Sequence, residues 1–396
     1  MQLLLLLCLA LLSPQGALSR RLRAKTKLPK EPSSRDFTFE LYRALASASP
    51  SQNVFFSPLS VSTILAILSL GAKGNTQEQI LGALGFKPQH QAMAQFHDNF
   101  RQLLMGLTQH RDSFQLNLGN ALFINKGLVI DNIFQLTIMT TYLAKIYPTN
   151  FEDPAAAQKQ INDYLAKQTQ GKIAGLIQNL DSTAVMVMVN YICFKAKWEI
   201  GFNNKTTQDQ DFYVTPENKL QVPMMNRADQ YFYFLDKDLS CTVVGIPYEG
   251  NATAYFILPN PGKMQQVESG LSKKTLRKWN QMTMRRRLNL YLPKFSIEGS
   301  YQLEKIFPNL GVRDIFTLSA NLSGIFKHSN IQVSQVVHKA TVEVDESGTR
   351  AVSGTGTVFS FRSAYPNSRT IRFNRPFLIA ILEPSTILFF GRVTQP

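Results

Sequence analysis

Apolar residues recur at different spacings in the two halves of the chain. Before about residue 180 they follow the three- and four-residue spacing of a helix face, as in VSTILAILSLGAK (61–73) and KQINDYLAKQTQGK (159–172). After it, short strand-like apolar runs prevail, as in AVMVMVNYICF (184–194), CTVVGIPY (241–248) and TAYFILP (253–259). Because helices and strands segregate along the chain instead of alternating, the pattern predicts an α+β fold with antiparallel sheets.

The pattern is not interrupted by a Pro/Gly/Ser-rich linker, and the sequence contains no internal repeat. A chain of this length commonly forms two or three domains. The missing linker argues against such a division.

The first 19 residues, MQLLLLLCLALLSPQGALS, form an uncharged leucine-rich run that ends in a small-x-small pattern. The run is short for a membrane span, and Pro14 and Gly16 weaken a helical anchor. It predicts a secretory signal peptide over residues 1–19, removed after Ser19. No later stretch is long and apolar enough to cross a bilayer, so we expect a soluble, secreted, extracellular protein without a transmembrane segment.

Three Asn-X-Ser/Thr sequons, at Asn204, Asn251 and Asn321, fit this route and predict glycosylation. Removal of the signal peptide leaves two cysteines, Cys193 and Cys241. Both lie in apolar, strand-like runs, where a buried free thiol is the ordinary interpretation. Spacing alone does not decide between two free thiols and a disulfide that joins them.

The net charge of +15 is concentrated in two windows. Residues 20–35 form a basic N-terminal arm, predicted to be flexible, which is either a binding segment or a solvated tail without function. The second window is LSKKTLRKWNQMTMRRRL (271–288), which lacks acidic residues. Its basic residues are Lys273, Lys274, Arg277, Lys278, Arg285, Arg286 and Arg287.

As one helix, the second window would present a cationic stripe. Lys274, Arg277, Lys278 and Arg285 would fall within an arc of roughly 100°, opposite Leu276, Trp279 and Thr283. Unrelieved like charge weakens a helix, so a polyanionic partner is expected. In a secreted protein the abundant polyanions are sulfated glycosaminoglycans, and we expect these rather than nucleic acid, although charge alone does not separate the two.

The chain has none of the GxSxG, HExxH or phosphate-loop motifs and no paired-cysteine metal spacing. Five histidines, His90, His97, His110, His328 and His338, are scattered without a nucleophile or metal pattern. We therefore predict no enzyme, no metal site and no prosthetic group. His338 lies in the strand-like run VVHKATVEV, which predicts a buried histidine satisfied by hydrogen bonds.

Residues 341–376 combine a run of small and hydroxyl residues with the pair Arg362-Ser363, a basic residue followed by a small one. The pair is typical bait for a trypsin-like protease. In a strand, one face of the preceding run would carry only small side chains and would enter an existing sheet with little steric hindrance. These residues are Thr349, Ala351, Ser353, Thr355 and Thr357. Composition alone also fits a mobile linker.

Several segments, in order along the mature chain, resemble the serpin family. They are NVFFSPLS (53–60) at the start of the family's helix B, Asn190-Tyr191 with FKAKW (194–198) in a central strand, Glu346-Ser347-Gly348-Thr349 at the hinge, and FNRPF (373–377) in the C-terminal signature. The chain is similar in particular to the antitrypsin-like group.

The resemblance implies one serpin domain over residues 36–396, with three mainly antiparallel β-sheets, about eight to nine helices and an exposed reactive-centre loop at about residues 346–372. It implies a scissile bond between Arg362 and Ser363. The implied hinge residues are Glu346, Gly348, Thr349, Ala351 and Ser353. The implied polar cluster beneath the main sheet, with the aromatic residue above it, comprises Ser57, Ser60, Asn190, His338 and Trp198.

The implied function is a monomeric suicide-substrate inhibitor of trypsin-like serine proteases. An arginine before the bond suits thrombin, kallikrein, plasminogen activators and activated protein C alike, so coagulation, fibrinolytic and reproductive-tract proteases all fit. A heparin-binding member of the family uses the corresponding basic helix, so heparin or a related glycosaminoglycan is expected to bind and accelerate inhibition. The alternative is a non-inhibitory serpin that carries a small apolar ligand. Such members tend to have bulky or charged residues on the inserting face, which this chain lacks.

Overall fold

The computed structural model describes most of the chain from Asp36 to Pro396. The described ranges are 36–87, 92–109, 114–171, 175–327, 331–349, 368–384 and 386–396. Eight α-helices lie within them: α1 Phe37–Ala48, α2 Pro58–Gly71, α3 Gly74–Ala83, α4 Ala92–Thr108, α5 Asn132–Tyr142, α6 Pro154–Gln168, α7 Met264–Ser269 and α8 Lys273–Met282. Four short 3-10 helices accompany them: η1 Asn204–Thr206, η2 Leu303–Lys305, η3 Phe307–Leu310 and η4 Asp314–Phe316.

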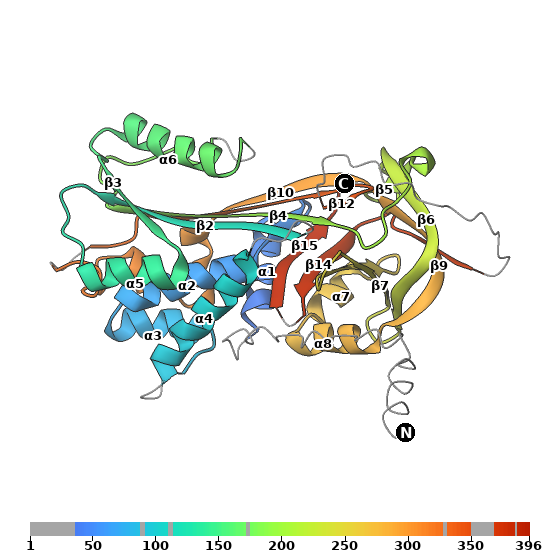
Figure 1. Cartoon of the computed structure of the whole chain (residues 1–396), viewed down its shortest axis with the longest axis horizontal. Helices are drawn as coiled ribbons and strands as arrows, with labels where there is room; N and C mark the ends of the chain where they lie inside the picture. The colour runs from blue at the N-terminus through green and yellow to red at the C-terminus, as the bar shows by residue number, and fades with distance from the viewer. Residues whose placement is uncertain are drawn as a thin grey trace, which may run out of the picture.

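A six-stranded sheet runs along the long axis of the molecule, with α6 on its outer face (Figure 1). Its strands, in spatial order, are β10 Phe295–Gln302, β11 Gln335–Val344, β12 Gly348–Thr349, β4 Met186–Lys197, β2 Phe114–Asn125 and β3 Lys145–Thr149. Where β12 ends, β11 and β4 pair directly and in parallel. The two-residue β12 therefore separates β11 from β4 at one end only.

A nine-stranded sheet packs beneath one end of the first. Its strands, in spatial order, are β1 Val54–Phe56, β15 Thr386–Val393, β14 Phe377–Glu383, β8 Thr253–Pro259, β7 Cys241–Pro247, β6 Lys219–Asp236, β9 Met284–Pro293 and β13 Arg369–Arg372, with β5 Gln208–Tyr213 paired to β6. The long strand β6 pairs with both β7 and β9. Two of the three expected sheets are thereby joined through β6 into one hydrogen-bonded sheet.

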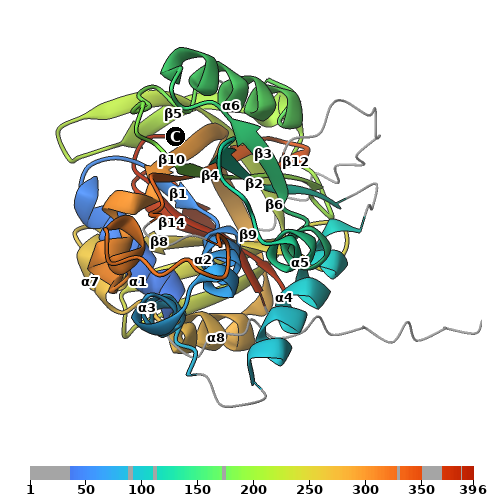
Figure 2. The same cartoon turned by 90° about the vertical axis from the view of Figure 1, so that its left-hand side faces the viewer.

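Strand β4 explains how the layers hold together, because it is buried on both faces. Val187 and Val189 pack with Ile161 and Leu165 of α6, whereas the alternate Met188 contributes to the core around α2. Burial on both faces accounts for its continuous apolar sequence. Figure 2 shows the consequence, with α6 on one side of the sheet and α1 to α4 on the other.

The predicted α+β class and the predominance of antiparallel pairing are confirmed. The predicted helices over 61–73 and 159–172 lie in α2 and α6. The helical first half also contains β1, β2 and β3, which the periodicity did not reveal. In β2 the sequence FQLNLGNALFIN alternates only weakly, since its second half is buried on both faces.

Candidate functional site

The end of the expected hinge lies inside the six-stranded sheet. Strand β12 pairs with β11 through Val344 and Thr349, and with β4 through Gly348–Lys197 and Thr349–Ala196. Both pairings are antiparallel. The chain after Val344 therefore turns back and enters the gap between the two strands.

Gly348 and Thr349 suit this position for different reasons. Gly348 has a φ of 152°, and a Cβ atom there would lie 2.2 Å from the carbonyl oxygen of Ala196, so only glycine fits. The Thr349 side chain is fully buried, and its Oγ1 lies 2.7 Å from the hydroxyl of Tyr248. The Tyr248 ring stacks on Trp198, with ring centroids 4.4 Å apart. The stacked rings of Trp198 and Tyr248 therefore support the hinge at Thr349.

The turn before β12 is held by side chains from other elements. Glu346 accepts a hydrogen bond from Thr207 Oγ1 at 2.8 Å and pairs with Lys294 Nζ at 3.0 Å. Burial raises the pKa of Glu346, but its hydrogen bonds and Lys294 outweigh burial and hold that pKa below its usual value. Trp198 Nε1 donates to the carbonyl oxygen of Asp345 at 3.0 Å. No sequence motif indicated a role for Tyr248, Thr207 or Lys294 at the hinge.

A polar cluster lies beyond the end of β12, where β11 and β4 pair directly. His338 and Asn190 are neighbours in that pairing, and His338 Nδ1 lies 2.6 Å from Asn190 Oδ1. Ser60 Oγ donates to the same oxygen at 2.6 Å. Ser57 caps α2 by accepting from the backbone N–H of Ser60 at 3.1 Å. All four side chains are fully buried, so the residues predicted for this cluster do meet beneath the sheet.

The contacts of His338 define its protonation. Its Nε2 accepts a hydrogen bond from the backbone N–H of Ser57 at 3.2 Å, so Nε2 carries no proton. The proton is then on Nδ1, which donates to Asn190. Burial lowers the pKa of His338 to about 3. The ring is therefore neutral at physiological pH and acts as a structural bridge, as the sequence predicted.

Several predicted site residues lie outside the described part of the chain: Ala351, Ser353, Arg362 and Ser363. Both ends of the expected loop over 346–372 are paired in sheets, the first in β12 and the second in β13, which runs parallel to β9. The part of the loop that contains the predicted scissile bond lies between these two strands in sequence.

The basic window is not one helix, which corrects the expected stripe. Helix α8 ends at Met282, Thr283 is extended, and Met284 begins β9. Arg285, Arg286 and Arg287 therefore lie on a strand that pairs with β6 over ten residues. In a helix, the like charges of this segment would repel one another without a compensating acid nearby. As a strand, the segment instead gains a ladder of backbone hydrogen bonds with β6.

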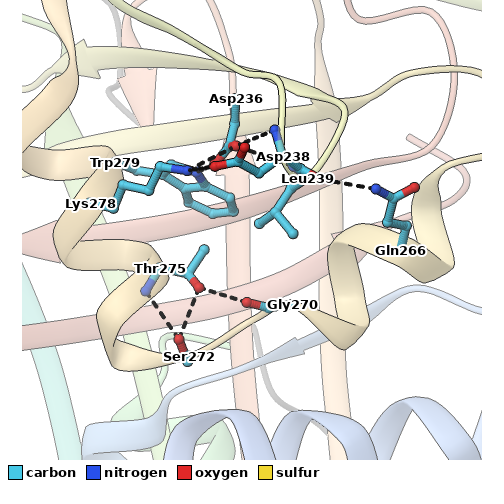
Figure 3. A network of polar contacts seen from close by, with 9 residues as sticks. All are labelled: Asp236, Asp238, Leu239, Gln266, Gly270, Ser272, Thr275, Lys278 and Trp279. Carbon is cyan, nitrogen blue, oxygen red and sulfur yellow. Dashed lines mark hydrogen bonds and ion pairs between the residues drawn. The ribbon is translucent and has the colours of Figure 1, made fainter.

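The basic residues are also less isolated than the local sequence suggested. Lys278 Nζ lies 3.1 Å from Asp236 Oδ1 and 2.8 Å from Asp238 Oδ2 (Figure 3). Arg285 lies 3.6 Å from Glu199 and covers the ring of Phe232 at 5.1 Å. These acids come from distant segments, so no local pattern could reveal them.

The two halves of the window nevertheless form one surface, here called the basic surface (residues 273–287). Lys278 covers Phe234 and Arg285 covers Phe232, two residues apart on one face of β6. Leu276 and Trp279 are buried and seat α8, as predicted. Lys274, Arg277 and Arg286 are exposed and have no ion pair with another described residue.

The remaining predicted features are placed as follows. Asn204, Asn251 and Asn321 are all exposed. Cys193 and Cys241 are buried free thiols, so no disulfide joins them. Within the described ranges, no helix is both long and apolar enough to cross a membrane, and no cluster of His, Cys, Asp and Glu suits a metal ion.

Comparison with known proteins gives the chain a family. The human plasma serine protease inhibitor is 61% identical, and the Bos taurus protein of that name 58% identical, with 100% of both chains covered in each case. The solved structure of human thyroxine-binding globulin complexed with thyroxine aligns with a TM-score of 0.87 and 36% identity, over 93% of this chain and 98% of that chain.

The two plasma serine protease inhibitors also support a resemblance that short segments of the sequence carry. The segments TLRKW (275–279) and FRSA (361–364) resemble protein C inhibitor, another name for plasma serine protease inhibitor, and the full-length identities confirm this resemblance. A family model described as Serpin (serine protease inhibitor) matches residues 32–396. The family confirms the expected serpin fold, and because it is one of inhibitors it confirms the prediction that the chain is not an enzyme. Since the family model spans every described residue and both relatives align from end to end, the chain belongs to the serpin family.

Proposed function

We propose that this serpin is a secreted inhibitor that traps trypsin-like serine proteases by inserting its cleaved loop into the six-stranded sheet. The observation that carries the proposal is β12, whose two residues already lie between β11 and β4 at the end where these strands separate. Insertion of the cleaved loop then lengthens a strand that already exists, and no new strand has to start between β11 and β4.

The register of β12 supports this mechanism. Six residues beyond Thr349, a continued strand would bring Thr355 opposite Asn190 on β4 and His338 on β11. Insertion must therefore break the contact between His338 and Asn190, and it brings a small hydroxyl residue to the same place. Thr355 shares the face of Thr349, which points into the buried interior. The run of small residues on that face fits the narrow space beneath the sheet.

The chemistry of the bait follows from Arg362. Its guanidinium is a long cation that pairs with the carboxylate in the specificity pocket of a trypsin-like protease. The protease serine attacks the Arg362 carbonyl carbon, the nitrogen of Ser363 leaves with a proton, and an acyl-enzyme forms. If the loop inserts before water reaches the ester, the protease stays covalently attached and distorted.

The basic surface supports a second part of the proposal, the binding of heparin or a related sulfated glycosaminoglycan. Lys274, Arg277 and Arg286 are exposed cations on two neighbouring elements. A long polyanion that also binds the protease would raise the encounter rate. Exposed sequons and relatives named for plasma support secretion and glycosylation.

The proposal is tested by incubating the protein with trypsin and boiling the mixture in detergent. Trapping predicts a covalent adduct with the summed mass of the protease and the large inhibitor fragment. Cleavage without an adduct would show a substrate and would refute the inhibitory function. The same assay with thrombin, a kallikrein, a plasminogen activator and activated protein C ranks the targets.

Carriage of a small apolar ligand is the second candidate, favoured by the likeness to thyroxine-binding globulin in complex with thyroxine. The buried position and small size of Thr349 argue for insertion instead. A carrier would release its ligand on loop cleavage without trapping the protease.

A further inference from the structure

The turn between β6 and β7 supplies two acids to the basic surface (Figure 3). Asp236 ends β6 and Asp238 follows two residues later, and both contact Lys278 of α8. The two carboxylates pair with the same lysine from very different environments.

Asp236 is a structural residue. Its side chain is 0% exposed, and its Oδ2 accepts a hydrogen bond from Trp279 Nε1 at 2.8 Å. Its Oδ1 accepts from the backbone N–H groups of Asp238 and Leu239 at 3.1 and 3.2 Å. Asp236 therefore shapes the turn and fastens α8 to it.

Asp238 has no comparable structural role. Its side chain is 84% exposed, and within the described ranges its carboxylate contacts Lys278 alone. Its backbone is nevertheless held beside α8, because Gln266 Nε2 donates to its carbonyl oxygen at 3.0 Å. The neighbouring Leu239 packs so closely on Gly270 that a Cβ atom there would lie 2.4 Å from Leu239 Cδ2. The backbone contacts thus place the Asp238 carboxylate within reach of Lys278.

This arrangement divides the basic surface into two classes of cation. Lys274 and Arg277 have no ion pair with another described residue, whereas Lys278 is already neutralised. A sulfate group that approaches Lys278 must displace a carboxylate that already pairs with it, so this lysine contributes little to counterion release.

We infer that Asp238 sets the affinity of the basic surface for sulfated polyanions, acting as a built-in competitor for Lys278. The inference rests on the proposed glycosaminoglycan binding and adds the residue that limits it. The competition is local, since Asp238 acts through one lysine and not through the net charge of the protein.

The test is Asp238→Asn, with binding to unfractionated heparin measured over a series of salt concentrations. Because exposed ion pairs contribute only modestly, the variant should bind about two- to fivefold more tightly. Its binding should also depend more steeply on salt, since one more cation contacts the polyanion. Glu217→Gln is the matched control, because it removes the same charge from an exposed turn position without an ion pair to the basic surface. It should leave the affinity close to that of the parent.

A double-mutant cycle separates local competition from a general charge effect. In a Lys278→Gln background, Asp238→Asn should no longer tighten heparin binding. An equal gain in both backgrounds, or no gain in the parent background, would overturn the inference while leaving heparin binding intact. A parent protein that does not bind heparin at physiological salt would instead refute the proposed glycosaminoglycan function and this inference with it. Thermal unfolding of each variant verifies that the fold is retained.

Discussion

At the residue scale, the hinge depends on a small side chain at Thr349. The side chain is fully buried against Tyr248, so Thr349→Arg would place an unpaired guanidinium in an apolar site, at a cost of several kcal/mol. We expect the variant to become a substrate that trypsin cleaves at the same bond. The amount of detergent-stable adduct should fall at least about tenfold. Thr349→Ser, which keeps the hydroxyl, is the control and should trap like the parent. Undiminished trapping by the arginine variant would rule out strand insertion.

The predicted bait residue is tested at the same scale. Arg362→Ala should abolish adduct formation with trypsin, because the specificity pocket loses its cationic partner, and Arg362→Lys should retain it. Mass spectrometry of the fragment released from the parent should begin at Ser363. Arg369 is the competing site, but it lies in β13, where its backbone pairs with β9 and is not available to pair with a protease. A fragment that begins at Thr370 would move the scissile bond to Arg369.

At the element scale, α8 and β9 both contribute exposed cations to the basic surface. Lys274→Ala with Arg277→Ala removes two exposed charges from α8 without disturbing Asp236, which the loss of Lys278 would leave partly uncompensated. The salt concentration that elutes the protein from immobilised heparin should fall, and heparin acceleration of trapping should fall with it.

Two controls locate that effect on α8. Lys126→Ala with Lys145→Ala removes the same charge from exposed positions near β2 and β3, far from α8, and should change elution much less (Figure 1). Deletion of residues 20–30 tests the N-terminal arm. If the deletion alone removes heparin binding and the α8 variant elutes like the parent, the arm is the binding site and the helix merely a charged face.

At the scale of the whole molecule, the buried cluster couples stability to pH. The pKa of His338 is lowered by burial to about 3 in the folded protein, below the usual value of 6.5. Between these values the unfolded chain binds a proton that the native state does not, so the native state loses stability as pH falls below about 6.5. The loss is at most about 1.4 kcal/mol per pH unit. Urea unfolding at pH 7.5, 6.5 and 5.5 should give a shallower pH dependence for His338→Gln than for the parent. Equal slopes would mean that the ring has the same pKa in the native state as in the unfolded chain.

Much of the fold and part of the site could be predicted from residue order alone. The helical spacing of 61–73 and the continuous apolar run of β4 each reflect how many faces of an element are buried, and burial is encoded locally by side-chain type. The motif matches singled out His338 and Asn190, which contact each other, and Thr349, which pairs with β4.

Tertiary structure alone decided where the basic helix ends and which charges are neutralised. Over 271–288 the sequence is compatible with a helix, but ten residues of pairing with β6 turn its second half into β9. Asp236 and Asp238 lie about 40 residues from Lys278 along the chain and reach it only because β6 and α8 pack together. Tyr248 meets Thr349 across 101 residues. Local sequence determines which elements can form and which face each of them buries, whereas contacts between distant charges and hydroxyl groups depend on strand register and packing, which no local window contains.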